Sequence, residues 1–246
     1  MQRGRVGIFD ADPRIPNARF YLGFPSWHYL SPLTGEGKPA PTTLTDSGLV
    51  VVDWSTGSDE PAQVLGGGDV VYVDIPDAGR HPLDYVVIDL APSRIAWIQP
   101  VASRVDRFVL VARPEWGGFE EAFGVLAALG TELGATDVGV VVNRVRESGY
   151  AKAFHDKLAM AGDRLLSLKT RLLGGVVFEP NLGSEQRERG AIVRARPDAV
   201  SALLLREIAA GILGTEGTRN PREGGAVPAA GVEKNDEDTD RAVTAS

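Results

Sequence analysis

The sequence contains no cysteine, and this absence removes several classes of protein at once. Without thiols the chain cannot form a disulfide framework, a thiolate metal site or a cysteine nucleophile. The three histidines, His28, His81 and His155, are far apart and have no carboxylate at ligand spacing, so they do not predict a metal site. A disulfide-stapled secreted protein is therefore excluded, and we expect a cytoplasmic one.

Long apolar runs are also missing. No stretch approaches the roughly 20 apolar residues that cross a bilayer, and the first residues enter a strand pattern instead of forming a signal peptide. The formal net charge of −7 argues against a generally basic nucleic-acid-binding protein. Residues 215–246 hold few large apolar side chains, which predicts a disordered acidic tail after an α/β domain over residues 1–214.

Two familiar kinds of catalytic or phosphate-binding motif are absent as well. No G-x-S-x-G nucleophile motif occurs. The one Gly-Lys pair, Gly37-Lys38, is followed by Pro39 and lacks the earlier glycine of a phosphate-binding loop. The glycine triplet at residues 66–68 has no lysine and is typical of a turn.

The sequence does contain alternating strand and helix patterns. Runs rich in valine and isoleucine predict strands that are buried on both faces. They lie at Val6–Phe9, Leu49–Val52, Val86–Leu90, Phe108–Ala112, Val138–Val142 and Val176–Phe178. Helical spacing predicts a helix over 118–133, a helix or broken helix pair over 150–168, and a helix from Pro197 to Ile212 with Val200 and Leu203 on its inner face. This order predicts an α/β fold, a mostly parallel sheet with helices on both faces.

Aspartates follow two of these strands at their carboxyl ends, where open parallel sheets hold ligands. Asp10 and Asp12 are two residues apart and point the same way if the strand persists, and Asp89 ends a second strand. Three carboxylates at one edge of a sheet can hold a hydrated Mg²⁺ and orient a water against a phosphate. The alternative, which the residues alone favour for any single pair, is that such aspartates cap helices or close turns.

Taken in order, the segments resemble the MinD/ParA family of deviant P-loop ATPases, which includes the flagellar-number regulator FlhG and the pilus-associated CpaE. The family's segments are similar to D-P-R-I-P-N-A-R-F-Y-L-G-F at 12–24, G-L-V-V-V-D-W at 48–54, the Walker B-like Y-V-V-I-D-L-A-P at 85–92, D-R-F-V-L-V-A-R-P-E at 106–115, V-V-N-R at 141–144 and F-E-P-N at 178–181. The resemblance covers about residues 4–213. It implies the SIMIBI-type fold of the P-loop NTPases, with ATP or ADP and Mg²⁺ as cofactors.

The resemblance also implies a role for each aspartate. Asp12 would orient or activate the water that attacks the phosphate, Asp10 would lie near the metal, and Asp89 would reach Mg²⁺ through its water shell. On the base side, Asn143 would hydrogen-bond the adenine edge with Arg144 beside it. Backbone near Pro180 would line the base pocket. Apart from the resemblance, Asn143 is interpreted as a turn residue that ends a strand.

The family's phosphate-binding loop, K-G-G-x-G-K-(S/T), has no counterpart, since it should precede Val6 and the sequence has five residues there. Without the amides and lysines of that loop, a triphosphate lacks its strong electrostatic anchor. The strand before the loop is central in the family, beside the Walker B strand. We therefore expect a gap that is closed by direct pairing of its neighbours or filled by another segment.

Three hypotheses for function follow. The first is a bacterial MinD/ParA-like pseudo-ATPase that acts in cell division, chromosome partitioning, or flagellum or pilus placement. The second is a truncated form of an active Mg-ATP-hydrolysing ATPase, and the third is a structural scaffold without nucleotide. We expect a protein partner, with a homodimer or DNA as further options. The DNA option depends on an arginine cluster at Arg187, Arg189, Arg194 and Arg196, which is otherwise interpreted as a solvated surface. The amphipathic membrane helix of MinD has no match after Gly214.

Overall fold

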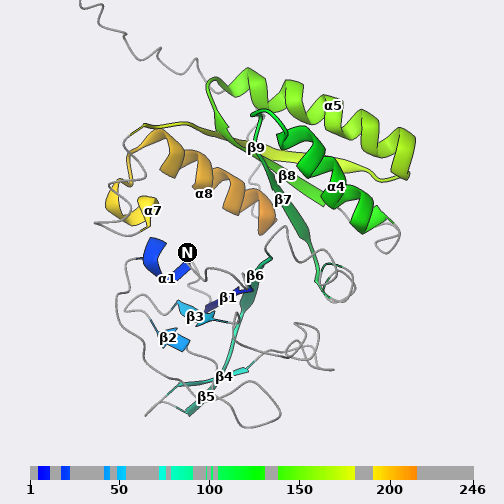
Figure 1. Cartoon of the computed structure of the whole chain (residues 1–246). Helices are drawn as coiled ribbons and strands as arrows, with labels where there is room; N and C mark the ends of the chain where they lie inside the picture. Colours follow the sequence, from blue (N-terminus) through cyan, green and yellow to red (C-terminus); the bar gives the residue numbers. More distant parts are fainter. Residues whose placement is uncertain are drawn as a thin grey trace, which may run out of the picture.

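A computed structural model describes residues 5–11, 18–22, 42–44, 49–53, 72–75, 79–90, 98, 101, 105–130, 138–180 and 191–214. Within these ranges, parallel strands form two sheets and helices cover both faces of one of them (Figure 1). The predicted α/β class is therefore confirmed. The predicted tail over 215–246 lies outside the described residues, as does most of the chain between residues 24 and 68.

The first sheet has the strand order β2-β3-β1-β6. β3 (Val50–Asp53) and β6 (Tyr85–Asp89) run parallel to β1 (Val6–Asp10) on either side of it, and β2 (Thr42–Leu44) is antiparallel to β3. A separate antiparallel pair, β4 and β5, spans Tyr72–Ile75 and Gly79–Pro82. The first sheet therefore places the carboxyl ends of three parallel strands at one edge.

The second sheet is formed by three parallel strands in the order β7-β8-β9. Their bounds are Phe108–Ala112 for β7, Val138–Val145 for β8 and Thr170–Val177 for β9. The helices are α1 (Ala18–Tyr21), α4 (Gly118–Gly130), α5 (Ser148–Leu166), α7 (Ile192–Ala195) and α8 (Val200–Ile212). Figure 1 shows α4 and α5 on one face of this sheet and α8 on the other.

Hydrophobic clusters on both sides of β8 hold these layers together. Val138, Val140 and Val142 pack on the α4 and α5 side with Leu126 and Leu158. The alternate residue Val141 packs on the other side, in a cluster with Ile208 of α8 and Val176 of β9. Since β8 is covered on both faces, its continuous apolar sequence is the expected pattern for a buried parallel strand.

The structure corrects two details of the predicted elements and decides between two alternatives for a third. β9 begins at Thr170, earlier than predicted, because Gly174 and Gly175 interrupt its apolar pattern. A Cβ atom at Gly175 would lie 2.6 Å from the Cβ of Ala151, so a small residue lets α5 approach the strand. The 150–168 pattern, predicted as a helix or a broken helix pair, forms one continuous helix, Ser148–Leu166. The predicted inner face of α8 was wrong in its first turn, since Val200 and Leu203 are exposed and Ala202 is buried instead.

His155 links α5 to β9 and gives a prediction about pH. Its Nε2 lies 3.2 Å from the Thr170 hydroxyl, and burial lowers the pKa of the imidazole below its ordinary value of 6.5 although the nearby Asp156 opposes this. The unfolded chain therefore binds this proton more readily than the folded one, so stability is complete above pH 6.5 and falls as the pH drops below it. Urea unfolding at pH 7.5 and pH 5.5 should show this loss, and His155→Gln should reduce it. An unchanged pH dependence in the variant would contradict the assignment.

Candidate functional site

The first part of the candidate site is a row of aspartates at the carboxyl edge of the first sheet. In register, Asp10 of β1 pairs with Asp89 of β6 on one side and with Asp53 of β3 on the other. Because paired residues of parallel neighbours project to the same face and such strands are about 4.8 Å apart, Asp10 and Asp89 share one face of the sheet. The structure thus brings together Asp10 and Asp89, as the sequence predicts. Asp53 had no predicted role, although V-V-V-D repeats the signal of an apolar run that ends in aspartate.

Asp10 has a defined structural partner. Its side chain is 2% exposed, and its Oδ2 accepts a hydrogen bond from the backbone N–H of Ala18 at 2.9 Å. Ala18 begins α1, so Asp10 has the helix-capping role that was the alternative interpretation of the sequence. A buried carboxylate needs such donors to offset its loss of water. Its predicted position beside a metal stays a prediction.

Asp89 is exposed, in contrast to Asp10. Its backbone carbonyl accepts a hydrogen bond from the Ala11 N–H at 2.9 Å, which keeps the chain after β1 beside β6 for one more residue. The carboxylate is therefore placed at the open end of the sheet, where water and ligands reach it. Asp12, the predicted catalytic residue, lies outside the described residues.

The second part of the site lies at the carboxyl end of β8. The Asn143 Oδ1 accepts a hydrogen bond from the Arg144 N–H at 2.8 Å, which is the local contact of a turn residue. Arg144 has a φ of 62° and lies at a shift in the register between β8 and β9. A left-handed backbone costs an L-residue other than glycine about 1–2 kcal/mol. This strain makes Arg144 a strong candidate for function, because strained residues concentrate at functional sites.

The side chain of Arg144, near the end of β8, contacts the segments that follow the two neighbouring strands, β7 and β9. Its Nε lies 3.1 Å from the Glu115 Oε1, after β7, and its guanidinium lies 4.8 Å from the ring centre of Phe178, after β9. Arg113 extends the group, with its guanidinium 3.8 Å from Glu115 and 3.6 Å from Glu121. Each exposed ion pair contributes little by itself, but together they fix the relative position of these segments. Neither Glu115 nor Phe178 had a role predicted from the sequence.

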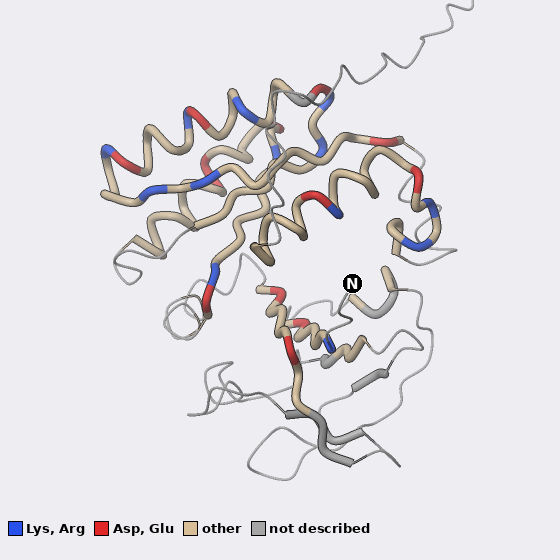
Figure 2. The backbone as a smooth tube through the Cα atoms, turned by 180° about the vertical axis from the view of Figure 1, so that it is seen from behind, with Lys and Arg blue, Asp and Glu red and all other residues tan. Residues whose placement is uncertain are grey.

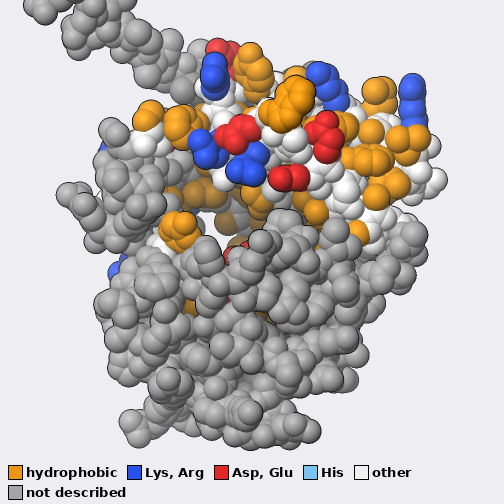
Figure 3. Space-filling view, viewed as in Figure 1, with side chains coloured by type: hydrophobic (Ala, Val, Ile, Leu, Met, Phe, Trp, Pro, Cys, Tyr) orange, Lys and Arg blue, Asp and Glu red, His pale blue; other side chains and the backbone are white. Residues whose placement is uncertain are grey.

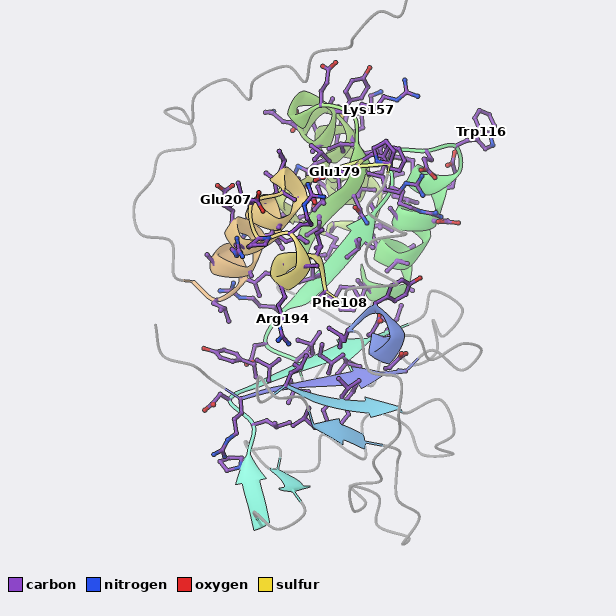
Figure 4. The ribbon with its side chains drawn as sticks, turned by 90° about the vertical axis from the view of Figure 1, so that its left-hand side faces the viewer. Phe108, Trp116, Lys157, Glu179, Arg194 and Glu207 are labelled. Carbon is purple, nitrogen blue, oxygen red and sulfur yellow. The ribbon has the colours of Figure 1, made fainter. Side chains whose placement is uncertain are left out.

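The segment after β9 is fixed by Glu179, which Figure 4 shows below α5 and beside α8. The Glu179 Oε1 accepts a hydrogen bond from the Ser201 N–H at 2.9 Å, in the first turn of α8. This carboxylate caps the helix and complements its dipole. Pro180 follows directly and is exposed. Asn143, Arg144 and Pro180 therefore lie at one edge of the second sheet, and their contacts with a base stay a prediction.

Both parts of the site lie at carboxyl ends of parallel strands. In Figure 4 the arrows of β1, β3, β6 and β7 point to broadly the same side of the molecule, and Figure 2 shows the acidic residues on the strands of the first sheet. Among the described residues, the carboxylates of Asp10 and Asp89 provide oxygen atoms, which are the ligands that Mg²⁺ prefers. No group of three or more histidine, aspartate or glutamate residues that could hold a metal occurs among the described residues.

The other predicted surfaces are described only in part. Of the arginine cluster, Arg194 and Arg196 are described and both are exposed, and Figure 4 shows Arg194 directed from α7 toward the first sheet. Figure 3 shows acidic and basic side chains interleaved over the described helical half, so this face carries no uniform basic patch. Among the described helices, none is long and apolar enough to span a membrane.

Comparison with known proteins identifies the fold. No family model matches the chain, and no curated protein matches its sequence. The MinC:MinD cell division protein complex of Aquifex aeolicus matches at a TM-score of 0.58 and 18% identity, over 86% of this chain and 84% of that chain. MinD of Pyrococcus horikoshii OT3, complexed with Mg-ADP, matches at 0.61 and 16% identity, over 87% and 86%. A candidate plasmid partition protein of Borrelia burgdorferi B31, bound to AMPPNP, matches at 0.55 and 14% identity, over 86% and 87%. The chain therefore has the fold of the MinD- and ParA-type ATPases.

Proposed function

We propose that this protein is a catalytically impaired relative of the MinD and ParA ATPases that binds Mg-nucleotide and acts in spatial positioning inside the bacterial cytoplasm. The observation that carries the proposal is the paired register of Asp10 and Asp89 at the carboxyl edge of the first sheet. A solved structure with this fold binds Mg-ADP, and another binds AMPPNP. The register gives this chain a pair of carboxylates at the edge where such folds hold ligands.

In this proposal, one set of residues holds the metal and another contacts the base. Bound Mg²⁺ supplies positive charge that offsets the charge of the phosphates. The exposed Asp89 holds the waters around that charge, while the buried Asp10 fixes the start of α1 and borders the same row. Asn143, Arg144 and the backbone at Pro180 contact the base. Asp12 is the residue proposed to orient the attacking water.

The proposed impairment follows from the lack, in this sequence, of a segment that anchors the phosphates. The sequence has no glycine-rich segment with lysine at the required spacing, and a triphosphate without such amides and cations is held weakly. We therefore propose that hydrolysis is impaired, because its transition state needs the same amides and cations, and that nucleotide binding is weakened. A partner protein would then distinguish the nucleotide-bound from the nucleotide-free protein. A complex of MinC with MinD, a protein with this fold, supports a protein partner.

Calorimetric titration of the 246-residue chain with ADP and ATP in the presence of Mg²⁺ tests the proposal. We expect saturable heat, and Asp89→Asn should weaken the affinity at least about tenfold because a charged ligand of the metal shell is lost. Asp163→Asn, which changes an exposed carboxylate on α5, is the matched control and should bind as the parent does. Absence of heat, or equal affinity in Asp89→Asn, would overturn the proposal.

Two alternatives have their own observations. Asp10 and Asp89 lie in one register row, which favours a truncated form of an active ATPase. Under this alternative the protein hydrolyses ATP, and Asp12→Ala abolishes the hydrolysis. The hydrogen bond from Ala18 to Asp10 favours a scaffold in which this carboxylate serves structure alone. The scaffold requires that Asp10→Asn changes stability while no nucleotide binds to the parent chain.

A further inference from the structure

A cavity of about 400 Å³ lies between the second half of α5 and the start of β9, and it opens to solvent. Ala159, Met160 and Asp163 of α5 line one side, and Lys169 and Thr170 line the other. Figure 1 shows the turn from α5 into β9 on the side of the second sheet away from α7. The cavity therefore lies at the amino end of β9, whereas the candidate site lies at the carboxyl ends of the strands. Cavities of about 300–1,000 Å³ commonly hold small molecules.

The turn between α5 and β9 fixes the two sides of this cavity relative to each other. Ser167 ends α5 in the left-handed region with a φ of 53°, a strained conformation of the kind that concentrates at functional sites. The buried Leu168 follows, and its N–H donates a hydrogen bond to the Gly162 carbonyl at 3.1 Å. A Cβ atom at Gly162 would lie 3.1 Å from the Leu168 carbonyl oxygen, so glycine lets the turn pack closely on the helix. Asp163 and Lys169 therefore extend from a rigid support.

Thr170 supplies a hydrogen-bond acceptor to the cavity. Its hydroxyl lies 3.2 Å from the Nε2 of His155, and the Asp156 Oδ1 lies 4.0 Å from the other ring nitrogen, Nδ1. The nearby carboxylate favours the tautomer of the neutral imidazole that carries its proton on Nδ1. The Thr170 hydroxyl then donates its hydrogen to Nε2. Its oxygen keeps the lone pairs that accept a hydrogen bond from a ligand.

Asp163 and Lys169 bring opposite charges to the two sides of the cavity. Both side chains are exposed, and neither forms an ion pair with another described residue. A ligand with a single charge would meet one attractive and one repulsive group, whereas a zwitterion satisfies both. Ionised groups make the stronger hydrogen bonds, so an ammonium group suits Asp163 and a carboxylate suits Lys169. Ala159 and Met160 add apolar surface beside these charges.

We propose that this cavity binds a free α-amino acid with an apolar side chain. The ammonium group of the ligand donates hydrogen bonds to the Asp163 carboxylate and the Thr170 hydroxyl oxygen. Its carboxylate accepts a hydrogen bond from the Lys169 ammonium, and its side chain packs on Met160. All of these residues lie at the amino end of β9. The assignment does not depend on nucleotide binding, so either can fail while the other stands.

Titration of the isotope-labelled 246-residue chain with L-leucine, followed by nuclear magnetic resonance, tests this site. We expect saturable shifts of the Lys169 and Thr170 amide signals at millimolar leucine or below. Isocaproate lacks the ammonium group of leucine, and isoamylamine lacks its carboxylate. Each analogue should bind at least about tenfold more weakly, because one charged group of the cavity loses its partner. Absence of saturable shifts, or an analogue that binds as tightly as leucine, would overturn the proposal.

Variants of the two charged residues separate this cavity from a general effect of charge. Asp163→Asn and Lys169→Gln should each weaken leucine binding at least about tenfold, since each removes one charge from the site. Both side chains are exposed, so neither substitution disturbs the core. Glu207→Gln is the control, because it neutralises an exposed carboxylate on α8, which covers the other face of the second sheet (Figures 1 and 4). This control should bind leucine as the parent does. Equal affinity in the parent and all three variants, or equal loss in all three, would place leucine elsewhere.

Discussion

Leu158→Ala is expected to lower the free energy of unfolding by about 2–5 kcal/mol, the range for truncating a fully buried leucine. Leu158 is 0% exposed and belongs to the cluster between β8 and the helices α4 and α5. Removing its isopropyl group leaves a cavity that the surrounding valines of β8 cannot fill, because they are β-branched and fixed in the sheet. Urea unfolding followed by far-ultraviolet circular dichroism measures the change.

The matched control lies two turns further along the same helix. Leu165 is 72% exposed, so Leu165→Ala should change the free energy of unfolding by no more than about 0.5 kcal/mol. Both changes remove the same atoms from helical positions, and alanine is the better helix former in both cases. Equal destabilisation by the two substitutions would show that α5 packs by a different face than the structure describes.

Gly118→Ala is expected to destabilise the protein by about 1–3 kcal/mol, because it overpacks a close backbone contact. A Cβ atom at Gly118 would lie 2.0 Å from the carbonyl oxygen of Arg113 and 3.0 Å from its carbonyl carbon. The obstacle is backbone, so no side-chain rotation relieves it. The segment between β7 and α4 must shift, and it carries Glu115, the ion-pair partner of Arg144. Urea unfolding should show the loss, and trypsin should cleave faster after Arg113.

Gly124→Ala in the same helix should have the opposite sign. A Cβ atom at Gly124 meets nothing within 4 Å, and glycine in a helix interior costs about 1 kcal/mol relative to alanine. Gly124→Ala should therefore stabilise α4 and leave cleavage after Arg113 unchanged. Destabilisation by both substitutions would mean that the Arg113 contact is not the cause.

The strands were predicted well because their signal is local. Phe108–Ala112 was predicted with the bounds that the structure has, and Val6–Phe9 differs by one residue at its end. The apolar runs of a doubly covered parallel sheet do not depend on which strand lies beside which. The start of β9 and the first turn of α8 were wrong for the opposite reason. Close contacts between elements decide them, such as that of Gly175 with Ala151.

The candidate site was predicted in part. Asp10 and Asp89 could be found because each ends an apolar run, and Asn143 and Arg144 because the ordered segments resemble a known family. Glu115 and Phe178 had no such signal, since their role comes from contacts with Arg144 across three strands. The hydrogen bond from the Ala18 N–H to Asp10 could not be predicted either, because the sequence does not say whether a carboxylate caps a helix or faces a ligand.

The sequence by itself determined the class of fold, the order of strands and helices, and the carboxylates at the strand ends, because apolar periodicity and residue type are properties of short segments. Only the tertiary structure decided which aspartates share a row, since register depends on pairing between distant segments. It also decided that Arg144 adopts a left-handed backbone and contacts Glu115 and Phe178. These features arise from the packing of whole elements, which no single stretch of sequence contains.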